Sequence, residues 1–332
     1  MSRQSLLLIL IASGALIVAA FVGVVLATSG ASDEELVIYS ARSHYGEEQP
    51  FEEFAERTGT DIRIRGGSAS ELYERLRSEG EDTPADVLIT VDAANLWRAR
   101  EAGLLEPLDS PKLEAAVPPD LRDADDTWFG LLLRARTIVR STERVGPEEV
   151  TTYEGLGDPR WKGRLCLRKR ISEYNASFVA DRLAKDGRAA TERMLRRWMA
   201  NDPEILGSDT EVLEAIADGD CDVGLTNHYY LERELEDDPG FPVAPVWADQ
   251  KGRGTHVNLS GLGVVRGSDR PDDARALIEF LLRPEAQRVF VENNHEFPVR
   301  GGPGIKRDPI DVDGAGPRLS EALGLMHEVG WD

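Results

Sequence analysis

The sequence is poor in the residues that most protein metal sites use. Its 332 residues include two cysteines and five histidines, and the cysteines are not clustered with histidines. A zinc site of the cysteine and histidine type is therefore disfavoured. Cys166 and Cys221 leave two interpretations open: a disulfide, as expected in an oxidising compartment, or two small buried apolar side chains.

Acidic residues outnumber basic ones, 60 to 39, and arginine supplies most of the positive charge. Lysine is rare, and the formal net charge is −21, so nucleic acid and anionic membrane surfaces are poor partners. The chain has no Gly-x-Ser-x-Gly, no Walker loop and no His-Glu-x-x-His. "GGSAS" (66–70) follows a predicted strand but lacks a phosphate-binding fingerprint. We predict that it is a turn in which a helix begins.

One long apolar run stands near the N-terminus, "LLLILIASGALIVAAFVGVVLA" (6–27). Its length favours an uncleaved membrane anchor, whereas the small residues Ser29 and Ala31 fit the cleavage site of a signal peptide. Both interpretations assign residues 1–31 to targeting. Both also place the rest of the chain outside the cytoplasmic membrane, because the positive end stays inside.

The remaining chain alternates short apolar runs with helical periodicity. Strands are predicted at 36–40, 61–66, 84–90, 163–168, 221–226 and 261–265, and helices at 50–58, 68–80, 94–102, 176–187, 190–201, 209–219, 271–282 and 319–330. Asp209 resembles an N-cap. This rhythm predicts parallel sheets flanked by helices. The segment 128–141 is long for one strand and could connect two lobes.

Four of the seven tyrosines, Tyr45, Tyr174, Tyr229 and Tyr230, stand just after predicted strands and before predicted helices. In parallel sheets, ligands bind at the carboxyl ends of strands, so these phenols are expected at a cleft. A phenol has a pKa of about 10 and ionises at neutral pH only beside a strong positive charge. A hard trivalent metal would supply that charge. The alternative is ordinary packing, with one ring in the core and the other at the surface.

Several stretches together resemble the periplasmic ferric-iron-binding proteins of ABC importers. These include "YSARSHY" (39–45), "EYNAS" (173–177), "CDVGLTNHYY" (221–230) and "EFPV" (296–299), and the likeness covers nearly everything after residue 35. The resemblance implies two doubly wound α/β lobes joined by a two-strand hinge, the type II periplasmic-binding-protein fold. The implied lobes are 32–135 with 257–302, and 136–256 with 303–332.

The resemblance also implies a site for one Fe(III) between the lobes. Tyr229 and Tyr230 would be metal ligands, and Tyr174 would be the ligand typical of the tyrosine-rich subgroup. The first lobe should add a ligand from "SHY", which is His44 in an ungapped match and Tyr45 after a shift of one residue.

Arg134 resembles the arginine that in some members of this family holds a synergistic anion, such as carbonate, beside the metal. A guanidinium fork suits such an anion, and a structural ion pair near the hinge is the alternative.

The resemblance therefore implies a binding protein, not an enzyme. It would capture ferric iron, bare or chelated, and deliver it to an ABC permease, and we expect it to be a monomer. One alternative keeps the fold and changes the cargo to an organic anion, a thiamine-like or a polyamine-like solute. A second alternative is a membrane-tethered extracellular sensor.

Overall fold

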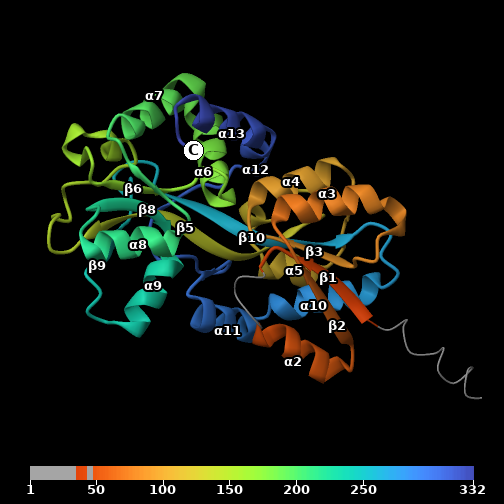
Figure 1. Cartoon of the computed structure of the whole chain (residues 1–332). Helices are drawn as coiled ribbons and strands as arrows, with labels where there is room; N and C mark the ends of the chain where they lie inside the picture. Colours follow the sequence, from red (N-terminus) through yellow and green to blue (C-terminus); the bar gives the residue numbers. More distant parts are fainter. Residues whose placement is uncertain (1–34, 43–47) are drawn as a thin grey trace, which may run out of the picture.

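The computed structural model describes residues 35–42 and 48–332. The predicted targeting segment 1–31 and the candidate ligands His44 and Tyr45 lie outside these described residues. Within them, two α/β lobes stand side by side and are connected by two long strands, β5 (Phe129–Ser141) and β10 (Thr255–Val265) (Figure 1).

The first lobe contains the N-terminal strands and helices and receives the chain again after β10. Its elements are β1 (Glu35–Ser40), α2 (Gln49–Thr58), β2 (Asp61–Gly66), α3 (Ala69–Glu79), β3 (Val87–Thr90), α4 (Ala93–Glu101), β4 (Leu105–Glu106), α5 (Pro111–Ala116), α10 (Pro271–Leu281), α11 (Pro284–Asn294) and β11 (Phe297–Pro298).

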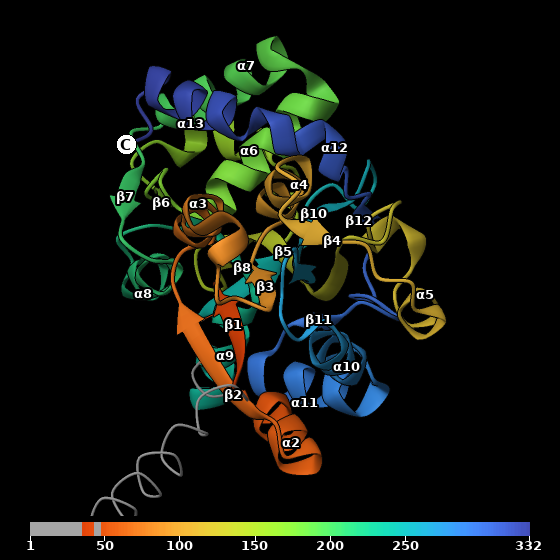
Figure 2. The same ribbon diagram turned by 90° about the vertical axis from the view of Figure 1, so that its right-hand side faces the viewer.

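The second lobe contains the middle of the chain and its C-terminal end. Its elements are β6 (Leu165–Arg168), α6 (Glu173–Asp186), α7 (Arg188–Met199), β7 (Glu204–Leu206), α8 (Asp209–Asp218), β8 (Val223–Asn227), α9 (His228–Asp237), β9 (Val243–Val246), β12 (Arg307–Asp308), α12 (Val312–Ala315) and α13 (Leu319–Glu328). The turned view in Figure 2 shows α12 and α13 beside α6, at the far end from α2 and α11.

The strands run in the order β2-β1-β3-β10-β5-β8-β6-β7. The prediction of parallel pairing is correct within each lobe, where β2, β1 and β3 are parallel and so are β8, β6 and β7. It is wrong for the middle of the path. There β10 is antiparallel to β3 and β5, and β5 is antiparallel to β8. The reason is that both long strands cross between the lobes in opposite directions.

Each lobe has its own apolar core. The first core draws on residues from 36 to 135 and from 257 to 299, and the second lobe is built around two clusters between 138 and 331. Tyr174 and Val312 are exceptions, because they belong to α6 and α12 of the second lobe but pack in the core cluster of the first. The two lobes therefore meet at these side chains.

The predicted helix ends are mostly found where the sequence places them. Gly59 and Gly219 end α2 and α8 in the left-handed conformation, with φ of 73° and 92°. Ser68 caps α3, as expected of a turn at 66–70. The prediction for Asp209 is wrong, because Ser208 caps α8 and leaves the Asp209 carboxylate for other partners. Helix α11 was not predicted.

Candidate metal centre

The candidate site forms where two parallel strands of the second lobe end. Strands β6 and β8 are neighbours, with Leu165 opposite Val223, so their carboxyl ends lie at one edge of the sheet. Helix α6 begins one short turn after β6, and α9 begins directly after β8 with Asn227 as its N-cap. The first turns of both helices therefore open toward the other lobe, and they carry Tyr174, Tyr229 and Tyr230.

Two of the tyrosine hydroxyls meet, and the third ring lies beside them. The Tyr229 Oη donates a hydrogen bond to the Tyr174 Oη at 3.1 Å and accepts one from the Asn227 Nδ2 at 3.2 Å. The rings of Tyr229 and Tyr230 lie with centroids 4.5 Å apart. Tyr229 is fully buried, Tyr174 is nearly so, and Tyr230 is partly exposed. Adjacent residues in a strand would point to opposite faces, whereas the start of a helix lets both rings lie on one side.

The Tyr174 phenol is neutral in the absence of a metal. Burial, and then the neighbouring phenols of Tyr229 and Tyr230, raise the pKa of Tyr174 well above its ordinary value of 10.0, and the Arg134 guanidinium only partly offsets this. The helix N-termini at α6 and α9 favour negative charge at the same place. The arrangement therefore suits oxygen donors that become phenolates once a highly charged cation displaces their protons.

Arg134 lies at the point where β5 crosses between the lobes. It is buried, its Cζ is 5.2 Å from the centroid of the Tyr174 ring, and its Nη1 donates to the Ser260 Oγ at 3.1 Å. Ser260 also accepts a hydrogen bond from the Nη1 of Arg42 at 3.1 Å. The geometry thus brings Arg134 to the tyrosine cluster and connects it to the first lobe.

The described residues that flank His44 and Tyr45 are held in the same region. The Nε of Arg42 donates to both oxygens of Glu48, at 3.1 and 3.0 Å, and its Nη2 donates to Glu296 at 2.8 Å. All three side chains are buried. Arg42 and Glu48, which flank the two candidate ligands in the sequence, therefore connect through Ser260 to Arg134.

Asp209 is a residue of the site that sequence reasoning missed. Its buried carboxylate pairs with Arg136, accepts from Arg168 Nη1 at 2.7 Å, and accepts from the backbone N–H of Asn227 at 3.2 Å. In turn the Arg136 Nη2 donates to the Asn175 Oδ1 at 2.8 Å. One carboxylate therefore fixes the starts of both tyrosine-bearing helices, through contacts that no local pattern indicates.

Glu173 and His228 were also missed, and each stands directly before a tyrosine. Burial, and then the charge of Asp92, raise the pKa of Glu173 to about 7. Burial lowers the pKa of His228 to about 3, so this ring is neutral. The His228 Nδ1 accepts from the backbone N–H of Ala135 at 3.2 Å, and its ring stacks on Phe297 with centroids 4.0 Å apart.

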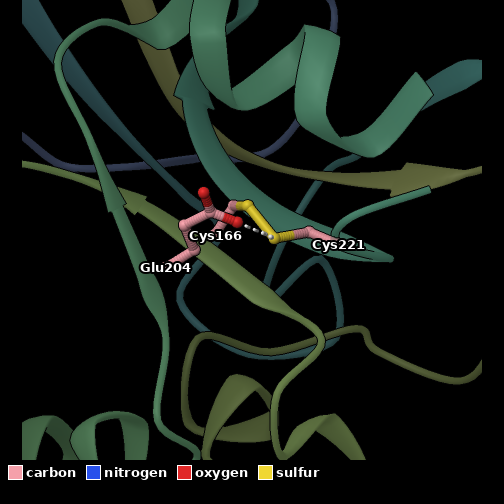
Figure 3. A group of neighbouring side chains, drawn as sticks. All are labelled: Cys166, Glu204 and Cys221. Atoms are coloured by element: carbon pink, nitrogen blue, oxygen red, sulfur yellow. Dashed lines mark hydrogen bonds between the residues drawn. A yellow bond between two sulfur atoms is a disulfide. The ribbon is translucent and has the colours of Figure 1, made fainter. Parts of the chain in front are cut away.

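The two cysteines lie at the other end of the same strands. Cys166 in β6 and Cys221 just before β8 are joined by a disulfide, with a Cα–Cα distance of 5.8 Å (Figure 3). The carboxylate of Glu204 lies beside them, its Oε2 4.0 Å from the Cys221 Sγ. Because both sulfurs are used by the bond, this group offers no thiolate to a metal.

The two lobes, the crossing strands and the buried donor cluster between them define a solute-binding protein of the type II periplasmic-binding fold. The model of the bacterial extracellular solute-binding protein family matches residues 41–288, and the chain belongs to this family. The proteins similar to it across this length are binding proteins of transport systems, not enzymes.

Among its relatives, iron uptake protein A1 of Synechocystis sp. is 39% identical over 325 residues, which cover 92% of this chain and 90% of that protein. The Fe(3+)-binding periplasmic protein of Serratia marcescens is 27% identical, with 92% and 93% covered. A Trichodesmium protein solved with iron and citrate is 37% identical, with a TM-score of 0.82, covering 90% of this chain and all of that one. The ferric binding protein of Campylobacter jejuni is 30% identical, with a TM-score of 0.84 and the same coverage.

Proposed function

We propose that this protein captures ferric iron outside the cytoplasmic membrane and delivers it to an ABC permease. The observation that carries the proposal is the contact of Tyr174 and Tyr229, whose hydroxyl oxygens lie 3.1 Å apart beside Tyr230 at the start of two helices. Two phenol oxygens that meet in a buried place, with a third tyrosine ring beside them, suit a hard trivalent cation. The names of the relatives from Synechocystis and Serratia support iron as the cargo.

The proposed ligands are Tyr174, Tyr229 and Tyr230 from the second lobe and either His44 or Tyr45 from the first. Phenolates would neutralise the charge of Fe(III), and the positive helix ends would keep those phenolates close together. The position of Arg134 over the Tyr174 ring supports a role in holding an anion beside the metal, such as carbonate. The citrate in the Trichodesmium structure makes a chelating carboxylate a second candidate for that anion.

We place the lobe boundaries at 32–135 with 257–302 and at 136–256 with 303–332, in keeping with the separate apolar cores. We also propose that the protein works as a monomer. The clustered tyrosines at the lobe interface favour a metal ion over a thiamine-like or polyamine-like cargo, because neither of those solutes needs several phenol oxygens in one place.

A titration with ferric citrate tests the function. We expect the protein to turn red to purple at about one iron per chain, because phenolate-to-iron charge transfer absorbs visible light. Each bound phenol must lose its proton, so binding should release protons, and the apparent affinity should fall as the pH falls. A protein that stays colourless at saturating ferric citrate would contradict the proposal.

The apolar run 6–27 decides how the protein is held outside the membrane. Among the residues that the structure describes, no helix is long and apolar enough to cross a bilayer, and the run lies outside them. Because of its length, we predict that it stays attached as an anchor. The intact mass of protein extracted from membranes measures this directly. A mature chain that begins near Ser32 would instead identify residues 1–31 as a cleaved signal peptide.

A further inference from the structure

The first turn of α3 in the first lobe is capped by residues from both lobes. A helix leaves four backbone N–H groups without intrahelical partners at its N-terminus. Two of them are satisfied locally by a capping box. The Ser68 Oγ accepts from the N–H of Glu71 at 3.2 Å, and the Glu71 carboxylate accepts from the N–H of Ser68 at 2.9 Å. The N–H groups of Ala69 and Ser70 remain.

The carboxylate of Glu173, from the second lobe, accepts hydrogen bonds from both of these N–H groups. Its Oε1 accepts from the N–H of Ala69 at 2.8 Å, and the same carboxylate accepts from the N–H of Ser70. A carboxylate at a helix N-terminus makes charge-assisted hydrogen bonds and also meets the positive end of the helix dipole. The N–H groups of Ala69 and Ser70 thus have this protein partner only while the two lobes are together.

The contact adjoins the candidate metal centre. Glu173 is the first residue of α6, and Tyr174 follows it, with its ring in the core cluster of the first lobe. Whatever fixes Glu173 against α3 therefore also fixes the first turn of α6, from which the Tyr174 phenol points.

We propose that Glu173 is a positioning residue that holds the lobes closed over the bound metal by capping α3 across the interface. This inference rests on the proposed function, since it concerns the iron held at Tyr174. Glu173 is not a metal ligand here. Its carboxylate sets the lifetime of the closed form and the orientation of the Tyr174 side chain, and so the rate at which iron leaves.

The experiment measures iron release from loaded protein into excess EDTA. Supporting residues outside the ligand set typically change metal affinity by about 10–100-fold. We expect Glu173→Ala to release iron about 10-fold faster than the unchanged protein. The charge-transfer band should keep its wavelength, because the phenolates remain. Glu173→Gln keeps a carbonyl oxygen that can accept from Ala69 and should restore part of the slow release.

The partner side of the contact offers a second variant. Ala69 is the first residue of α3, where proline is well tolerated, and Ser68 has φ −68° and ψ 153°, which suits the residue before a proline. Ala69→Pro therefore removes a donor N–H without breaking the helix, and its ring Cδ takes the place of that hydrogen against the Glu173 Oε1. It should speed release at least as much as Glu173→Ala. In the double variant the two effects should not add, since both remove one contact.

Glu236→Ala is the matched control. Glu236 also reaches across the lobes, with its Oε2 2.8 Å from the His295 Nε2, but it is largely exposed and at the far end of α9. We expect release within about twofold of the unchanged protein. Equal acceleration in this control, or unchanged release in Glu173→Ala, would overturn the proposal. Iron loading of the unchanged protein separates this failure from failure of the proposed function, because the latter would give no bound iron to release.

Discussion

Replacing Tyr229 and Tyr230 together by phenylalanine should abolish the colour of the iron-loaded protein and weaken ferric binding by more than about 100-fold. The lower bound follows because even residues outside the ligand set change metal affinity by about 10–100-fold, and this variant removes two proposed ligands. The rings keep nearly all their apolar area, so the fold should survive. Visible absorption and a competition titration against citrate measure the effect.

The same variant should lower stability only modestly. The Tyr229 hydroxyl bonds to Tyr174 and to Asn227, so its loss removes two hydrogen bonds and should cost about 1–3 kcal/mol. Tyr73→Phe is the matched control, because it makes the same chemical change in a ring that stacks on the Arg98 guanidinium at 3.9 Å. The control should keep both colour and affinity. Unchanged absorption and affinity in the double variant would mean that the tyrosine pair is packing and that the functional proposal is wrong.

Removing the disulfide should cause the largest loss of stability. Replacing Cys166 and Cys221 by alanine opens a loop whose ends are 55 residues apart. A loop of this length corresponds to about 4 kcal/mol of stabilisation by restriction of the unfolded chain. For a chain of this size we expect the unfolding temperature to fall by roughly 6 °C. Thermal unfolding followed by circular dichroism measures the change.

Reduction provides the control for this prediction. The unchanged protein in reducing agent should unfold near the temperature of the double alanine variant, and reducing agent should have no further effect on that variant. Thiol titration of the unfolded, unreduced protein should find no free thiol. Two titratable thiols would show that the pair is reduced in the exported protein and would contradict the prediction.

The sequence predicts the elements of this fold better than their arrangement. Apolar runs such as 36–40 and 221–226 can be predicted as strands from the local sequence alone, because a strand that is buried on both faces is apolar along its length. The antiparallel middle of the sheet is not predictable in this way, since the pairing of Val257 with Ala135 joins residues that are far apart in the chain. Helix α11 was missed because its apolar positions are few, with Ala286 and Phe290 as its buried apolar residues.

The candidate site, like the fold, could be predicted from the sequence only in part. Placement of Tyr174, Tyr229 and Tyr230 after strands predicts that they share one edge of a sheet, and the structure brings the first two into hydrogen-bond contact. The supporting residues could not be found from the sequence. Asp209 resembles a helix cap in a local reading, yet its carboxylate reaches Arg136 and Arg168, which are 73 and 41 residues away along the chain.

The three tyrosines that the structure brings together all belong to one lobe, and this fixes an order of events. With the proposed ligand set, iron can bind to the tyrosines of α6 and α9 while the lobes are still open. Capture therefore does not require prior closure of the lobes. Departure is different, because parting the lobes withdraws only what the first lobe contributes and leaves three phenolates on the metal. We therefore expect unloading at the permease to need a second chemical event after opening, such as protonation of the phenolates, reduction of the iron or transfer to a competing chelator.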